Sequence, residues 1–147
     1  MIVRVLEKKA PDAVIVPLAQ QENLAEKLAE IARHAGFEPS ALQTDFRAEA
    51  KEVFVLYAAN SPGRKFYLVG LGKKDGFQEV YAALRAFCFR YKSKLPQRAG
   101  VELRHFEPEK IARLTDAAVS GMLLGLYHTG LYQTGSEAKP TPVFGTD

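Results

Sequence analysis

The sequence predicts an α/β protein of three layers, in which helices flank both faces of a mixed β-sheet. Short runs rich in β-branched and aromatic residues alternate with helical patterns, an order typical of layered α/β folds. The runs Glu52–Ala58 and Arg64–Gly70 are almost continuously apolar, which predicts strands buried on both faces. Segments 24–35 and 77–91 each carry one apolar stripe at helical spacing, so we expect them to cover such a sheet.

Composition limits the class of protein without naming a partner. The 147 residues suit a single domain over 1–147, and 47% hydrophobic with 25% charged residues is ordinary for a soluble globular protein. A formal net charge of +3 alone implies neither nucleic acid nor membrane. The single cysteine, Cys88, excludes an internal disulfide, and the longest nearly apolar run, 117–127, is about half of a membrane span. No signal peptide is recognisable, so we expect a cytoplasmic domain without membrane contact.

The first elements are expected to be two short strands, Ile2–Leu6 and Ala13–Val16, followed by the helix at 24–35. Asn23 with Glu26 three residues later resembles a capping box, and Gly36 suits the position after the helix end. The local sequence therefore predicts both ends of this helix.

Further strands are indicated by turn residues and by alternation. The two apolar runs at 52–58 and 64–70 flank a turn-forming segment and predict an antiparallel hairpin. Val101–Phe106 alternates apolar with charged residues, which is typical of an edge strand. Lys139–Phe144 begins a further strand, and 133–147 is interpreted as the start of a linker or as the last strand.

Two helices are predicted in the second half. For the helix at 77–91, Asp75 is the expected N-cap with Gln78 at the reciprocal position, and Pro96 follows its end. A last long helix opens at Glu107–Glu109 with Pro108 in its first turn. Small residues recur in it every fourth position and predict a close approach to a sheet or another helix: Ala117, Gly121 and Gly125.

A glycine-rich turn after the strand at 64–70 suggests a phosphate site. Gly70, Gly72 and Gly76 are spaced G-x-G-x-x-x-G, however, whereas a dinucleotide fingerprint needs G-x-G-x-x-G. The backbone amides and the lysine pair 73–74 could still attract an anion. We favour a tight structural turn that brings the strand close to the following helix, with an anion site as the alternative.

No catalytic, cofactor-binding or metal-binding set of residues is recognisable. His34, His105 and His128 lie in three different elements without metal-ligand spacing, and each is interpreted as a surface or helix-end residue. Cys88 lies on an apolar stripe and predicts a buried, inert thiol. The serines at 61, 93, 120 and 136 lack a nucleophile-elbow context. We therefore assign no site residues and do not expect catalysis by this chain alone.

Segment 64–104 is basic, with ten Lys or Arg against three Asp or Glu. Arg85, Phe89 and Lys92 share a helix face opposite the apolar stripe, so Phe89 is expected to be exposed. Such a face could bind another protein, or nucleic acid through phosphate contacts and stacking. Solvated charges without a partner are a third interpretation, and a protein interface is the one we favour.

Three segments in order resemble the N-terminal domain of the leucyl aminopeptidases, the cytosol aminopeptidase family. They are Phe46–Ala50 (FRAEA), Tyr67–Lys74 (YLVGLGKK) and Gly121–Tyr127 (GMLLGLY), the last followed by Tyr132. The order and spacing agree over about residues 1–145. Two departures stand out: Ala48 replaces the usual glycine, and the residues before Tyr132 differ from the family pattern.

The resemblance implies a macrodomain-like, non-catalytic scaffold that helps to organise a hexameric, cytosolic two-metal aminopeptidase, an enzyme that releases N-terminal residues from peptides. The expected partners are its own catalytic domain and the other subunits. The two divalent ions, zinc or manganese, belong to that catalytic domain, whose metal motifs are absent from this sequence. As alternatives, Asp12 with the Gly70–Gly76 turn could bind ADP-ribose or another nucleotide, or the basic segment 64–104 could bind nucleic acid.

Overall fold

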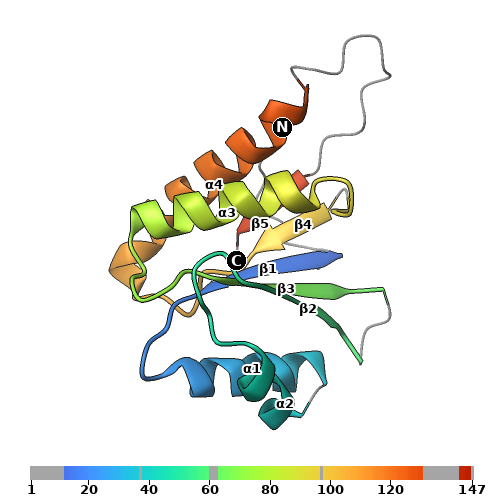
Figure 1. The fold of residues 1–147 in the computed structure, drawn as a ribbon, viewed down its shortest axis with the longest axis vertical. Coiled ribbons are helices and arrows are strands. Elements are labelled where there is room, and N and C mark those ends of the chain that lie inside the picture. The colour runs from blue at the N-terminus through green and yellow to red at the C-terminus, as the bar shows by residue number, and fades with distance from the viewer. Residues whose placement is uncertain (1–11, 37, 60–62, 97, 131–142, 147) are drawn as a thin grey trace.

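The computed structural model describes residues 12–36, 38–59, 63–96, 98–130 and 143–146, and within them the chain forms three layers (Figure 1). Helices α1 and α2 cover one face of a β-sheet, and α3 and α4 cover the other. The elements run in the order β1 (Ala13–Leu18), α1 (Leu24–Ala35), α2 (Pro39–Asp45), β2 (Val53–Tyr57), β3 (Lys65–Gly70), α3 (Phe77–Tyr91), β4 (Arg98–Val101), α4 (Pro108–Gly130) and β5 (Val143–Thr146). The predicted three-layer α/β architecture is confirmed, while the predicted strand Ile2–Leu6 lies outside the described residues.

The described strands form one mixed sheet in the order β2-β3-β1-β4-β5. The pair β2 and β3 is antiparallel, as the hairpin prediction required, and the other pairs are parallel. Side chains of β1 alternate between the layers: Ile15 packs toward α3 and α4, whereas Val14 and Val16 pack toward α1 and α2. Apolar residues on both faces of β1 therefore supply two separate cores.

Two strand predictions were wrong in detail. The strand β2 is only partly buried, and Tyr57 on it is 62% exposed, because β2 is the outermost described strand on its side of the sheet. The strand β4 covers Arg98–Val101 rather than Val101–Phe106, and it lies between β1 and β5 rather than at an edge. Leu103, on which the predicted alternation rested, instead anchors the loop after β4 in the core, together with Phe106.

One of the two predicted helix N-caps was wrong, whereas the predicted C-terminal glycine is confirmed. Asn23 is the N-cap residue of α1, as predicted, but it makes no side-chain capping bond; the residue at the cap of α3 is Gly76 rather than Asp75. Gly36 adopts the left-handed conformation (φ 82°) at the end of α1. Helix α2 was not predicted. Leu42 is the one residue that the structure shows as buried on this helix, so its sequence carries no repeated apolar position.

The small-residue ridge of α4 packs against α3. An added Cβ at Gly121 would lie 2.4 Å from the carbonyl oxygen of Tyr81, and one at Gly125 would lie 2.5 Å from that of Arg85. The two helices therefore touch backbone to backbone, as the spacing of the ridge predicted. Among the described residues, no helix has both the length and the apolar character needed to cross a membrane.

Candidate functional site

The glycine turn after β3 is filled by the protein's own backbone. The amides of Gly70, Leu71 and Gly72 donate hydrogen bonds to the carbonyls of Glu52, Leu18 and Ala48, over 2.7, 2.9 and 3.0 Å. These three amides are therefore not available to cradle a phosphate, because each already has a carbonyl acceptor. The structure supports the interpretation of a tight structural turn.

The segment that closes this turn is residues 46–52, not the helix that follows the strand. The amide of Lys51 donates to the carbonyl of Gly70 (2.8 Å), and the carboxylate of Glu52 accepts from the amides of Arg47 (3.3 Å) and Glu49 (3.0 Å). Ala48, which the resemblance places where glycine is usual, adopts a left-handed conformation (φ 57°). Our expectation that the glycines bring β3 close to α3 was thus wrong for Gly70, which approaches Glu49 instead.

Asp12 and the glycine turn lie at opposite ends of the parallel strands. Asp12 precedes β1, whereas the register pairs Leu18 at the other end of β1 with Gly70. Six strand residues separate the two ends, a distance of roughly 20 Å at the usual rise per residue. The fold does not bring together the two parts of the nucleotide site that the sequence suggested.

Asp75 joins three segments instead of capping α3. It accepts a hydrogen bond from the side-chain amide of Gln21 (3.0 Å), and its carboxylate lies 3.6 Å from the ammonium group of Lys110. Lys27 packs over the ring of Phe106, and burial lowers its pKa, an effect that the charge of Asp75 partly opposes. Asp75 thus ties the segment before α3 to the segment before α1 and to α4.

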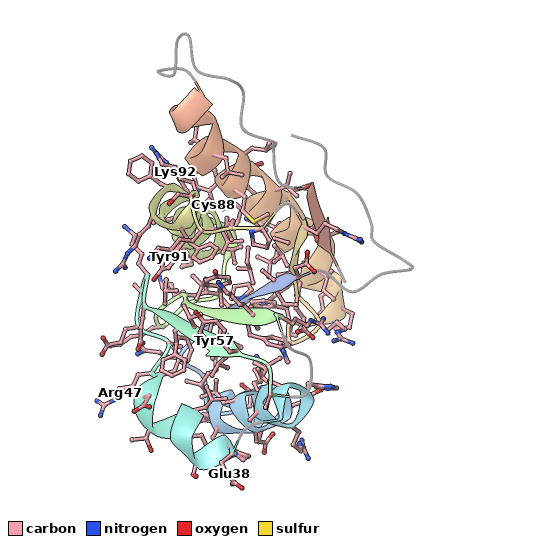
Figure 2. All side chains as sticks on the ribbon, turned by 90° about the vertical axis from the view of Figure 1, so that its right-hand side faces the viewer. Glu38, Arg47, Tyr57, Cys88, Tyr91 and Lys92 are labelled. Atoms are coloured by element: carbon pink, nitrogen blue, oxygen red, sulfur yellow. The ribbon has the colours of Figure 1, made fainter. Side chains whose placement is uncertain are left out.

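The predicted inert thiol is confirmed. Cys88 is fully buried under α4, and burial raises its pKa to about 12 (Figure 2). It is therefore protonated at neutral pH and is not a nucleophile. Among the described residues, no group of three or more His, Cys, Asp or Glu could hold a metal ion.

The histidines differ from one another. His34 is exposed in the last turn of α1, as predicted, and lies 4.0 Å from Glu30. His128 belongs to the last turn of α4, but its side chain is outside the described residues. His105 is not a surface residue: it is half-buried in the loop after β4, and burial lowers its pKa. The carboxylates of Glu102 and Glu30 oppose that change in pKa, and Lys27 and Arg104 add to it.

A pH dependence of stability follows from His105. Because its folded pKa lies below the ordinary value of about 6.5, the unfolded chain binds the proton first as the pH falls. The stabilising contribution of the neutral imidazole is therefore complete above about pH 6.5 and is lost as the pH falls from there through the folded pKa. Urea unfolding between pH 5 and 8 is expected to show a smaller slope against pH for His105→Gln than for the unsubstituted chain. Equal slopes would show that His105 does not titrate differently on unfolding.

The outer surface of the helical layer carries exposed apolar residues among cations. Phe89 on α3 is 50% exposed, as predicted, and the ammonium group of Lys92 lies 4.7 Å from its ring centre. Leu124 on α4 is 37% exposed, and its neighbour Gly125 packs on the backbone amide of Phe89. With the exposed Arg85, these residues make a surface that we call the α3–α4 outer face: Arg85, Phe89, Lys92 and Leu124.

Tyr57 forms a separate exposed aromatic site on β2. The ammonium group of Lys65 lies 5.3 Å from its ring centre, and Figure 2 shows Tyr57 at the sheet, apart from Lys92. The sequence does not reveal this exposure, because the apolar run of β2 resembles that of the buried strand β3. Leu124 was missed for a similar reason, since it lies in the longest apolar run of the chain.

These observations define a class first: an α/β domain with a macrodomain-like fold. The macrodomain of DarG from Thermus aquaticus is similar over 99% of this chain and 98% of its own, with a TM-score of 0.54 and 9% identity. That likeness concerns the fold alone.

The chain belongs to the cytosol aminopeptidase family, whose N-terminal domain matches residues 7–136. A mutant of tomato leucine aminopeptidase is similar over 98% of this chain and 31% of its own, with a TM-score of 0.70 and 17% identity. The bottromycin maturation enzyme BotP, in complex with Mn, is similar over 94% of this chain and 27% of its own, with a TM-score of 0.61 and 19% identity. The chain thus spans less than a third of the length of either. Comparison with curated proteins gives no match.

Proposed function

We propose that this chain is the non-catalytic scaffold domain of a cytoplasmic leucyl aminopeptidase and acts through contacts. It would hold the catalytic domain in place and join subunits of a homo-oligomer, a hexamer in the family. The two divalent metal ions, zinc or manganese, would be bound by the catalytic domain. The family match to an N-terminal domain supports this function.

The α3–α4 outer face is the observation that carries the proposal. Phe89 and Leu124 are large apolar side chains exposed on adjacent helices, and aromatic residues in such positions mark protein contacts more often than isolated surface residues do. Arg85 and Lys92 beside them favour a partner that offers an apolar recess with carboxylates around it. The close packing of α3 on α4 holds the two apolar side chains at a fixed separation.

The assignment as non-catalytic is tested by assaying the purified chain for hydrolysis of leucine p-nitroanilide with added Mn²⁺ or Zn²⁺. The expected rate equals that of buffer with the same metal. A whole leucine aminopeptidase, assayed in parallel, serves as the positive control. Metal-dependent hydrolysis that copurifies with the chain and disappears on chelation would contradict the proposal.

A further inference from the structure

A cavity of about 210 Å³ lies between the sheet, α1 and the loop after β4. Its apolar lining comes from Val14, Phe66 and Ile31. Its polar lining comes from side chains of three different segments: His34, Arg64, Glu102, Arg104 and His105. Because Val14 and Phe66 stand near the starts of β1 and β3, the cavity lies at the end of the sheet away from the glycine turn.

Two side chains of this lining each hold a buried polar atom that has no hydrogen-bond partner among the described residues. The atoms are Nε of Arg64 and Nε2 of His105. The guanidinium Nε–H is only a donor, and a ring nitrogen of neutral histidine can also donate, depending on the tautomer. Buried donors without acceptors are rare in folded proteins, and such atoms call for an explanation. Because both side chains line the cavity, a modest rotation of each would bring its buried nitrogen within reach of a ligand with acceptor oxygens.

The charges around the cavity leave a surplus on the positive side. Glu102 pairs with Arg104, whose Nε donates a hydrogen bond to the Glu102 carboxylate over 2.9 Å. The guanidinium group of Arg64 stacks on Phe66, with 5.4 Å between its carbon and the ring centre, and no carboxylate of the described residues pairs with it. Two of the last carbonyls of α1 have other donors, since those of Ala32 and Ala35 accept from the amides of Gly36 and Ala59.

The size of the cavity limits what can fill it. Pockets for drug-sized ligands and cofactors range from about 300 to 1,000 Å³. At about 210 Å³ this cavity is too small for a nucleotide and has room for one small ion with a few waters. Arginine is the side chain best suited to a carboxylate or phosphate group, because its planar donors match their oxygens.

We propose that this cavity binds a small oxyanion, a carboxylate or phosphate group, through Arg64 and His105. The site is separate from the glycine turn and from the α3–α4 outer face, and it does not depend on the function proposed above. Stacking on Phe66 holds the guanidinium group in place, and the walls of the cavity keep the anion partly out of water, which strengthens its hydrogen bonds.

Titration followed by ¹⁵N NMR of the arginine Nε and histidine ring signals tests the proposal. The 147-residue chain is titrated with inorganic phosphate, acetate or chloride at constant ionic strength and pH. The signals of Arg64 and His105 are expected to shift saturably with phosphate or acetate and not with chloride. A tighter response to phosphate assigns a phosphate ligand, and a tighter response to acetate assigns a carboxylate.

Arg64→Met is expected to weaken binding at least tenfold, because it removes a charged hydrogen bond. Arg113→Met makes the same change of charge at an exposed position of α4 and is expected to leave binding unaltered. If Arg64→Met does not fold, His105→Ala replaces it with the same expected loss. Shifts that fail to saturate, or that are equal in all variants, would mean an adventitious ion only and would overturn the proposal. The absence of any shift with phosphate and with acetate would mean that water fills the cavity, and it would overturn the proposal as well.

Discussion

Replacing Gly70 with alanine is expected to destabilise the domain by about 3–5 kcal/mol. The added Cβ would lie 1.9 Å from the carbonyl oxygen of Glu49 and 2.7 Å from the carbonyl carbon of Ala48, and both atoms belong to the backbone. The segment cannot withdraw without loss, since three backbone hydrogen bonds of 2.7 to 3.0 Å join residues 48–52 to Gly70 and Gly72. The predicted cost is therefore that of breaking this connection, not of one side-chain contact.

Urea unfolding followed by far-UV circular dichroism measures this effect, because the sequence contains no tryptophan. The matched control is Gly76→Ala in the same turn. There the nearest atom to an added Cβ is the carboxylate oxygen of Glu79, at 3.0 Å, and this flexible side chain can move away. We expect the control to change the free energy of unfolding by less than about 1 kcal/mol. If both variants lost the same free energy of unfolding, the close backbone approach at Gly70 would not be the reason that glycine is needed there.

Gly121→Ala is the second substitution with a large expected effect, and its sign separates two physical effects. Helix propensity alone predicts that alanine in place of an interior glycine stabilises a helix by about 1 kcal/mol. Packing predicts the reverse, because the added Cβ would lie 2.4 Å from the carbonyl oxygen of Tyr81 in the backbone of α3. Helices α3 and α4 would have to separate, and overpacking typically costs about 1–3 kcal/mol. We expect packing to dominate and the domain to lose stability.

The control for helix propensity is Ser120→Ala, one residue away on the exposed side of α4. It is expected to be neutral or stabilising by up to about 0.5 kcal/mol. Thermal unfolding of both variants gives the comparison, and Gly125→Ala, with its Cβ 2.5 Å from the carbonyl oxygen of Arg85, should behave like Gly121→Ala. A rise in melting temperature for Gly121→Ala would mean that α3 and α4 are not in backbone contact.

The sequence predicted the elements whose side-chain pattern is set by burial. The apolar runs of β1 and β3 and the stripe of α3 are long enough to show a period, and Gly36 has the conformation that its residue type favours. The errors arose where tertiary contacts overrode local patterns. Asp75 pairs with Gln21 and Lys110 instead of capping α3, and β4 is built around Ala99 and Gly100, which have low strand propensity.

The candidate surfaces were predictable to a different extent. The exposure of Phe89 was predicted because it lies opposite the apolar stripe of one helix, and helical spacing in the sequence is enough to show this. The cavity at Arg64 and His105 was not, because residues 41 positions apart meet there only through the pairing of β1 with β3 and β4. The glycine turn suggested a phosphate site because its spacing does not show that the carbonyls of Leu18, Ala48 and Glu52 accept hydrogen bonds from its amides.

Sedimentation velocity over a range of chain concentrations tests most directly whether this domain acts through the α3–α4 outer face. The chain is expected to self-associate reversibly, and Phe89→Ser or Leu124→Ser is expected to weaken that association at least tenfold, the loss typical of a central interface residue. Tyr57→Ser, which removes an even more exposed aromatic side chain on β2, should leave the association constant unchanged. A chain that stays monomeric at all concentrations, or association that Phe89→Ser and Leu124→Ser leave unaltered, would contradict the account.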